Sequence, residues 1–384
     1  MFRNLHISQF KVDQDKITNC VALMISGLLV YVFLNALFEF PYNNKLMAST
    51  SVLIFVITVI ILQNKISKFQ LVFFLLYLIV TVLVAQSRNR PWFLYFAFYW
   101  GLIGFSIGLL MLNTKVKSFI FMIPFYITVA TTIMAVYIFN DDMTSNTGDS
   151  GLFLLNRNAV AMFIFTFAVI PTILKYSRGE KINFSDITNL GILVFAQSLT
   201  QSRAGLLIAL LYLVFTICTL IINRYRTTKL ATHEIQIPKN KKIIISIGII
   251  LLILILFYLI KDSRLIHDGL SSSGRVAIYR SYFEELTVQK LIFGFEPSLY
   301  KANTHMHNSF IELLVTSGII GALPIFIVLI ITCKKLISKS FNLTLIFSLL
   351  MLYSMVEFYT LFLYGDFALI PLILIAGDQK KRKQ

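Results

Sequence analysis

Long apolar runs recur along the whole chain, and they constrain its fold more than any other feature. Most of them have about 17 to 25 residues, the length that an α-helix needs to cross a bilayer. Their apolarity is continuous and does not alternate, which excludes membrane-spanning strands. Of the 384 residues, 57% are hydrophobic and 14% are charged, and the mean hydropathy is +0.79. The sequence therefore predicts an all-α, polytopic membrane protein with a single membrane domain over residues 1–384.

The apolar runs predict about twelve transmembrane helices. The seventh run and the last two are short or weakly bounded, so any count from ten to thirteen is open. Residues 1–17 are polar and carry no pattern of a cleavable signal peptide, so we expect the first run to remain as a helix. The predicted spans are 20–40, 47–63, 69–86, 92–112, 118–139, 158–174, 187–199, 204–222, 243–260, 309–333, 341–356 and 359–376.

Lysine and arginine residues indicate the orientation, because they accumulate in cytoplasmic loops. With the N-terminus in the cytoplasm, 23 of the 34 lysines and arginines fall on the cytoplasmic side. The acidic segment 140–150 then falls outside. We expect both termini in the cytoplasm and one larger periplasmic segment with short amphipathic helices, residues 261–308, between the ninth and tenth spans. Since topology explains most of the net charge of +16, we expect no nucleic-acid partner.

The three cysteines give no sign of a disulfide or of a metal site. Cys20, Cys218 and Cys333 all lie in or beside apolar runs, and their spacing is not that of metal ligands. We therefore expect them to act as small apolar residues, and we expect no cofactor.

Several arginines fall on the outer side, against the bias that topology imposes. Arginine is always charged, and its fork of donors fits a phosphate or a carboxylate. The group therefore predicts an anionic ligand beside the outer helix ends. The alternative is that some of these side chains only anchor lipid phosphates, above all Arg88 and Arg90. The outer arginines are Arg88, Arg90, Arg157, Arg203, Arg264, Arg275 and Arg280.

The stretch LTQSRAGLL at 199–207 predicts a tight outer hairpin with Arg203 at its tip or slightly inside the membrane. A charge at membrane depth costs about 3 kcal/mol or more unless it is paired or hydrated, so it usually faces a cavity. No acidic residue lies nearby in the sequence. Arg203 is therefore a candidate site residue, with an interfacial anchor as the alternative.

The outer segment contains a predicted amphipathic helix. The serines at 271–273 offer an N-cap, and Arg275 then stands in the first turn, where free backbone donors favour an anion. Tyr279, four residues later, shares a face with Arg275. A surface helix with ordinary anchoring cations is the alternative. The predicted apolar positions are Val276, Ile278, Tyr279, Phe283 and Leu286.

The stretch THMHNSFIELLVTSGIIG at 304–321 places polar groups directly before a long apolar run. Ser309 with Glu312 predicts a capping box, which starts the tenth span near Ser309 and leaves His307 and Asn308 just outside it. The His305-x-His307 pair could indicate a metal, but no clear third ligand accompanies it. We therefore expect no metal here.

Together these motifs resemble the O-antigen ligase and polymerase family of bacterial envelope enzymes. The resemblance covers about residues 150–325. The segment LIFGFEPSLY departs from the Gly-x-Gly that is usual before the histidine, and the outer segment is shorter than in typical lipopolysaccharide ligases. The motifs are LNRNAVA at 155–161, SRAG at 202–205, GR…Y at 274–279 and HNSFIELLVTSGIIG at 307–321.

The resemblance implies a metal-independent glycosyltransferase of the bacterial inner membrane. Its donor would be an oligosaccharide on undecaprenyl diphosphate, and its acceptor a sugar hydroxyl at the periplasmic face. Arg203 and Arg275 would neutralise the leaving diphosphate. His307 would act as general base, kept neutral by neighbouring cations. The further substrate-binding residues would be Arg157, Arg264, Tyr279, Arg280 and Asn308.

The acceptor decides between two forms of this activity. An O-antigen or polysaccharide polymerase uses another lipid-linked repeat, whereas a ligase uses lipid A–core; the short outer segment and the HNSF form favour the polymerase. A flippase or transporter for the same lipid is the rival of a different class. It would have polar residues near the bilayer centre and internal repeats, and neither is clear in the sequence. A flippase and a chain-length regulator are also implied as partners, together with membrane lipid.

The predicted topology can be tested by cysteine labelling in intact spheroplasts. We expect a cysteine at Ser272 to react with a membrane-impermeant reagent, because residues 261–308 are predicted to lie in the periplasm. A cysteine introduced in 229–240 should stay unlabelled until the cells are opened. The reverse pattern would invert the orientation and remove the basis for a periplasmic site.

Overall fold

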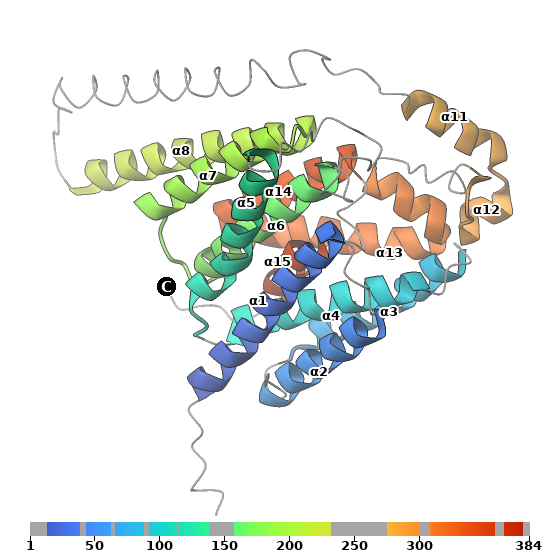
Figure 1. Ribbon diagram of the computed structural model, residues 1–384, viewed down its shortest axis with the longest axis horizontal. Helices are drawn as coiled ribbons and strands as arrows, with labels where there is room; N and C mark the ends of the chain where they lie inside the picture. Colours follow the sequence, from blue (N-terminus) through green and yellow to red (C-terminus); the bar gives the residue numbers. More distant parts are fainter. Residues whose placement is uncertain are drawn as a thin grey trace, which may run out of the picture.

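The computed structural model describes residues 14–38, 44–62, 66–87, 92–113, 115–137, 157–231, 275–298, 308–357 and 365–378, and these residues form helices and no strand (Figure 1). The helices are α1 (Gln14–Phe38), α2 (Asn44–Leu62), α3 (Lys68–Ser87), α4 (Trp92–Asn113), η3 (Ser118–Phe121), α5 (Met122–Tyr137), α6 (Arg157–Ser177), α7 (Phe184–Leu199), α8 (Arg203–Ala231), α11 (Arg275–Glu285), α12 (Val288–Phe293), α13 (Ser309–Lys339), α14 (Phe341–Val356) and α15 (Asp366–Gly377).

The expected all-helical fold is confirmed for the described residues, and the helix lengths support a membrane protein. Seven of their helices are long and apolar enough to cross a membrane, and further apolar stretches of 10 to 17 residues lie in α4, α14 and α15. Eleven of the predicted spans coincide with described helices, and the ninth, 243–260, lies outside the described residues. The count of twelve spans stays a prediction.

The centre of the bundle is formed by helices that are buried on all sides. Every residue of α15 is buried, and 83% of the most apolar part of α6 is buried. Aromatic rings join these two helices to α4: Trp100 lies 4.8 Å from Phe367 and 6.1 Å from Phe163, measured between ring centroids. A helix that is apolar all round fits such a position.

Glycines on one face of α4 let α15 approach closely. A Cβ atom added to Gly104 would lie 2.8 Å from the backbone O of Asp366, and one added to Gly108 would lie 2.7 Å from a Leu374 methyl carbon. Small residues at helix contacts allow backbones to pack closely in membrane proteins, where burial from water supplies little attraction between helices. The position of α15 therefore depends on these two glycines.

Contacts between helix ends agree with the alternating directions that the sequence predicts. The backbone N–H of Lys117, before η3, donates to Asn19 Oδ1 near the start of α1 at 3.1 Å. Lys335 Nζ, near the end of α13, lies 4.7 Å from the centroid of the Phe69 ring at the start of α3. Lys339 Nζ donates to the backbone O of Ile375 near the end of α15 at 2.6 Å. Each contact joins helix ends that the sequence assigns to the same side of the membrane.

The packing of α4 on α15 predicts that a glycine-to-alanine substitution destabilises the protein at Gly104 and not at Gly191. Gly104→Ala should lower the midpoint of thermal unfolding in detergent, because overpacking costs about 1–3 kcal/mol. Gly191→Ala, in α7, has nothing within 4 Å of the added Cβ and gains helix propensity. It should leave the midpoint unchanged or raise it. Equal midpoints for both variants would contradict the tight contact.

Candidate functional site

The hairpin between α7 and α8 holds Arg203 at the first position of α8. Ser202 caps this helix, because its hydroxyl oxygen accepts a hydrogen bond from the backbone N–H of Gly205 at 3.2 Å. The Thr200 hydroxyl oxygen accepts from the backbone N–H of Ser202 at 3.3 Å. Gln201 has a φ of 55°, a conformation that costs a non-glycine residue about 1–3 kcal/mol. The hairpin is thus a closely specified turn that fixes the position of Arg203.

Gly205 lets the start of α8 pack directly against α6 and α7. A Cβ atom added to Gly205 would lie 2.3 Å from Gln197 Oε1 and 2.9 Å from Ala161 Cβ. The buried Gln197 side chain donates through Nε2 to the backbone O of Ala161 at 2.7 Å. Ala161 lies about one turn after Arg157, the first residue of α6. The asparagine-rich motif at the start of α6 and the SRAG motif therefore meet in the structure.

α13 begins with Asn308 as its cap. The Asn308 Oδ1 atom accepts hydrogen bonds from two backbone N–H groups of the first turn, at 3.0 and 3.1 Å. The predicted capping box of Ser309 and Glu312 is wrong, because Ser309 already lies inside the helix. The Ser309 hydroxyl instead donates to the backbone O of Glu357 at 2.8 Å. The start of α13 is therefore tied to the end of α14.

The C-terminal end of α14 joins the start of α13 to the hairpin before α8. Asn308 Nδ2 donates to the backbone O of Met355 at 3.0 Å. The fully buried Tyr353 hydroxyl lies beside Ser202 and Glu357, and Glu357 is itself only 2% exposed. We call this part of the bundle the arginine end, and it is formed by Arg157, Arg203, Asn308 and Glu357.

Helix starts give the arginine end a positive potential. A helix N-terminus carries about half a positive charge, and the N-termini of α6, α8 and α13 all lie here. Arg157 and Arg203 stand at two of them, partly exposed, and each engages another group of the chain. Glu357 supplies a negative charge nearby. Ser202 and Asn308 cap two of these starts, so the arginine side chains and the backbone N–H groups that the caps leave open form a suitable site for a phosphate-type anion.

α11 packs on α13 through Tyr282, which is not among the predicted apolar positions. Tyr282 is 3% exposed and packs with Val315, whereas Phe283 is 65% exposed. The Tyr282 ring stacks on Phe295, with centroids 5.6 Å apart, and the predicted contact of Phe283 with the membrane surface stays a prediction. Tyr279 packs against the same cluster. Burial raises the pKa of the Tyr282 phenol, so the ring remains neutral.

Two glycines bring the end of α12 against a break in α13. Gly318 is non-helical, with a φ of 62°, and Gly294 has a φ of 81°. A Cβ on Gly318 would lie 2.5 Å from the backbone N of Gly294, and a Cβ on Gly294 would lie 2.8 Å from the backbone N of Gly318. The backbone N–H of Phe295 donates to the backbone O of Val315 at 2.9 Å beside them. Only glycine fits at both positions.

The structure brings part of the predicted site together. Arg157, Arg203 and Asn308 lie at the arginine end, although they come from different parts of the chain. Tyr279 lies on α11 in the cluster that packs on the first turns of α13. Arg280, the next residue, is exposed on α11. The α11–α12 segment lies beside α13 at one edge of the bundle (Figure 1).

Several other predicted site residues are not among the residues that the structure describes. Arg264, the serines at 271–273 and His307 lie outside the described residues, and of Arg275 only the backbone at the start of α11 is described. Among the described residues, no group of three or more histidine, cysteine, aspartate or glutamate side chains could hold a metal ion.

Sequence reasoning missed three features of this region. Glu357 separates two apolar runs, and the rule that acidic residues at membrane depth are functional candidates could have found it. Gln201 shows its unusual backbone only in three dimensions. The contact of Gly294 with Gly318 joins positions that no local pattern connects.

No protein-family model matches this chain, and no curated protein sequence matches it.

The glycine contact predicts how the α12 segment is held. Gly318→Ala should strain the break in α13 and release residues 288–298, which then exchange their amide hydrogens faster in mass-spectrometric measurements. Gly27→Ala, whose added Cβ has nothing within 4 Å, is the matched control and should leave this exchange unchanged. Unchanged exchange in Gly318→Ala would show that other contacts hold α12.

Proposed function

We propose that this chain is a membrane glycosyltransferase that transfers a glycan from a polyprenyl diphosphate, undecaprenyl diphosphate in bacteria, to a sugar hydroxyl at the periplasmic face of the inner membrane. The observation that carries the proposal is the arginine end. Three helix N-termini of the described chain meet there, and two of them carry an arginine. Three of the four motifs that resemble the O-antigen ligase and polymerase family, at 155–161, 202–205 and 307–321, contribute residues to this end.

The arginine end suits a diphosphate because its charge is spread over several fixed donors. Arg157 and Arg203 start helices that are held by buried packing, so their backbone positions are set before a ligand arrives. Preorganised donors stabilise charge that develops during a reaction without the cost of reorganisation. Glu357 at the end of α14 limits the resting positive charge and can hold neighbouring donors in place.

The proposed reaction uses charge stabilisation and one proton transfer. The glycosidic C–O bond to the diphosphate breaks, and its electron pair moves onto the leaving diphosphate, where Arg203, together with Arg275, neutralises the added charge. The acceptor hydroxyl oxygen forms the new C–O bond, and its proton passes to the His307 imidazole. A general base of this kind contributes about 10²–10⁴-fold to a rate.

In this proposal the α11–α12 segment would complete the site. Tyr279 packs in the cluster that joins α11 to α13, and Gly294 meets Gly318 in the same region. Arg280, on the exposed side of α11, is available to a bound glycan. Arg264 belongs to the same proposed site through the sequence pattern alone.

Two acceptors remain within this proposal. A polymerase would join lipid-linked repeats, and a ligase would transfer the glycan to lipid A–core. The short outer segment and the HNSF form of the motif favour the polymerase, which would work with a flippase and a chain-length regulator.

A transporter is the second candidate, and one contact favours it. The Tyr77 hydroxyl donates to Asp366 Oδ2 at 2.7 Å between α3 and α15, and both side chains are buried. A buried acid within a helix bundle is a typical feature of ion and substrate pathways. Detergent micelles separate the two candidates, because they have no two sides: an enzyme still forms product there, and a flippase does not.

The proposed chemistry predicts a specific set of losses in detergent solution with a polyprenyl diphosphate-linked repeat. His307→Ala should lower the rate by about 10²–10⁴-fold, as expected for a general base. Arg203→Lys should also lose most activity, because a point charge does not replace the guanidinium fork. The wild-type rate should fall at acid pH as the imidazole, with an ordinary pKa of about 6.5, becomes protonated.

His305→Ala is the matched control and should keep most of the activity, with EDTA present throughout. If both histidine variants lost activity equally and added divalent metal restored it, the pair would be a metal site and His307 would not be a general base. Full activity in both His307→Ala and Arg203→Lys would contradict the proposed site, and no product from the wild type would favour the transporter.

A further inference from the structure

A cavity lies at the other end of α6, away from the arginine end. Its volume is about 390 Å³, within the range of small-ligand sites. It is bounded by η3 and α5 on one side and by the ends of α6 and α7 on the other. We call this region the lysine end, after Lys175 in its wall. Its polar lining is Ser118, Tyr126, Thr172, Lys175, Tyr176, Ser185, Asp186, Asn189 and Tyr212, and its apolar lining is Phe119, Met122, Ile123, Ala168, Pro171 and Leu190.

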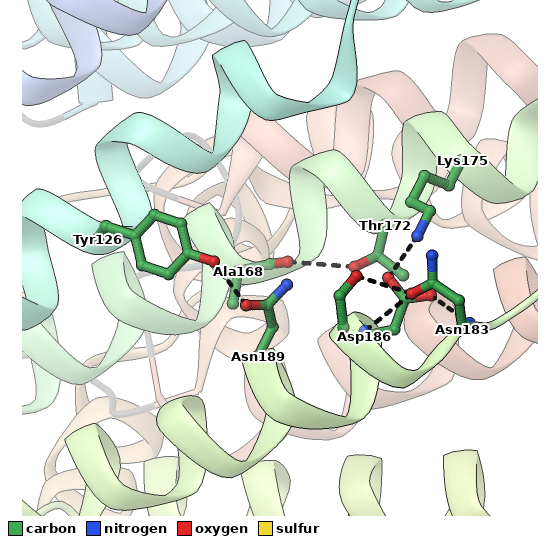
Figure 2. A network of polar contacts seen from close by, with 8 residues as sticks. Tyr126, Ala168, Thr172, Lys175, Asn183, Asp186 and Asn189 are labelled. Atoms are coloured by element: carbon green, nitrogen blue, oxygen red, sulfur yellow. Dashed lines mark hydrogen bonds and ion pairs between the residues drawn. The ribbon is translucent and has the colours of Figure 1, made fainter.

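The floor of the cavity is an ordered polar network (Figure 2). Lys175 Nζ lies 2.6 Å from Asp186 Oδ1, and both side chains are largely buried. Asp186 Oδ2 accepts from the backbone N–H of Asn183 at 2.8 Å, and Asn183 Oδ1 accepts from the backbone N–H of Asp186 at 3.1 Å. This reciprocal capping box fixes the start of α7. On the α5 side, the Tyr126 hydroxyl donates to Asn189 Oδ1 at 2.7 Å.

The network leaves N–H donors of Lys175 and Asn189 at the cavity, beside hydroxyl groups that can donate or accept. Lys175 carries three N–H donors, and Asp186 uses one of them. Because Asn189 Oδ1 accepts from Tyr126, its amide nitrogen points to the side of Thr172, as Figure 2 shows. Both oxygens of Asp186 are already engaged. A ligand that accepts several hydrogen bonds therefore fits this floor better than a ligand that donates them.

The apolar wall faces the surroundings of the bundle. Phe119 is 59% exposed and Tyr126 is 45% exposed, and both line the cavity. These residues belong to η3 and α5, which lie in an apolar stretch long enough to cross a membrane. In a bilayer, a side chain exposed on such a helix would contact lipid. The cavity is thus lined both by lipid-facing rings and by the polar ends of two helices, which is the surface that an amphiphile requires.

Cations flank the cavity in the neighbouring loops. Lys115 and Lys117 precede η3, and Lys181 precedes α7; all three are exposed. Arg178 is paired with Glu180 at 4.0 Å. Since Asp186 is balanced by Lys175, the loops leave a positive excess beside the cavity, and this excess favours an anionic ligand.

We propose that the cavity binds the phosphodiester headgroup of a membrane phospholipid from the leaflet at the lysine end. The phosphate accepts from Lys175 and Asn189, and the first acyl carbons lie against Phe119 and Met122. This site is independent of the proposed glycosyl transfer, because it lies at the opposite end of α6 from Arg157.

The test is lipid binding to the delipidated, full-length chain, measured by native mass spectrometry. Dioleoyl phosphatidylethanolamine and dioleoyl phosphatidylglycerol should bind more tightly than dioleoylglycerol, which has the same chains and no phosphate. Lys175→Gln combined with Asp186→Asn removes the charges without leaving one unpaired. It should weaken phospholipid binding by about tenfold, the size expected for one charge-assisted hydrogen bond.

Ala168→Phe should abolish the bound phospholipid by filling the cavity, and Lys115→Gln is the control for a lysine outside the lining. Equal binding of dioleoylglycerol and the phospholipids by the wild type would overturn the proposal, even if no variant folds. Equal binding of water-soluble glycerophosphoethanolamine would overturn the lipid as the source. The same loss in Lys115→Gln as in the double variant would show general surface attraction and would also overturn it.

Discussion

The arrangement of this protein depends on one constraint: backbone polar groups inside a bilayer must find partners within the protein. Helices satisfy this constraint along their length, but each helix leaves four N–H groups and four C=O groups open at its ends. The described chain closes several ends with side chains, through Ser202 before α8, Asn308 before α13 and Asn183 before α7. Polar chemistry is therefore concentrated where helices end, and both candidate sites lie there.

The caps are effective because the helices that carry them are held by tight packing. Gly205 brings α8 against α6, and the glycines of α4 bring α15 into the centre. Such contacts fix helix ends to the precision that a binding site requires, since sites on rigid elements are better defined than sites on loops. Three residues of the SRAG motif have separate structural roles. Ser202 caps α8, Arg203 bears the positive charge, and Gly205 allows α8 to pack closely on α6.

Hydropathy predicted most helices closely, because apolar length is a local property of the sequence. Hydropathy did not predict the ends of helices that continue beyond their apolar residues. α13 was expected over 309–333 and runs to Lys339, since Lys335 and Lys339 bind Phe69 and the end of α15. The family resemblance implied that Arg157, Arg203 and Asn308 belong to one site; they lie at the same end of the bundle, and the site itself stays a proposal.

The local details that the sequence did not predict share one physical cause. Whether Ser309 or Asn308 caps α13 depends on the backbone of Glu357, which comes from another helix. The burial of Tyr282 in α11 depends on Phe295 and Val315. The break at Gly318 exists because the backbone at Gly294 lies against it. In each case the deciding partner is distant in the sequence, so a periodic or local pattern carries no information about it.

α6 connects the two candidate sites and makes them electrically different. Arg157 starts the helix and Lys175 lies near its end, about 27 Å apart along the axis. At the arginine end, three helix N-termini add positive potential to the arginines, which suits a group whose negative charge grows during a reaction. At the lysine end, Asp186 balances Lys175, the start of α7 offsets the C-terminus of α6, and the exposed loop lysines leave a small positive excess. Such a site suits a ligand of small and constant charge. The two proposals therefore lie at opposite ends of α6: catalysis at the arginine end, where the helix starts, and lipid binding at the lysine end, where it finishes.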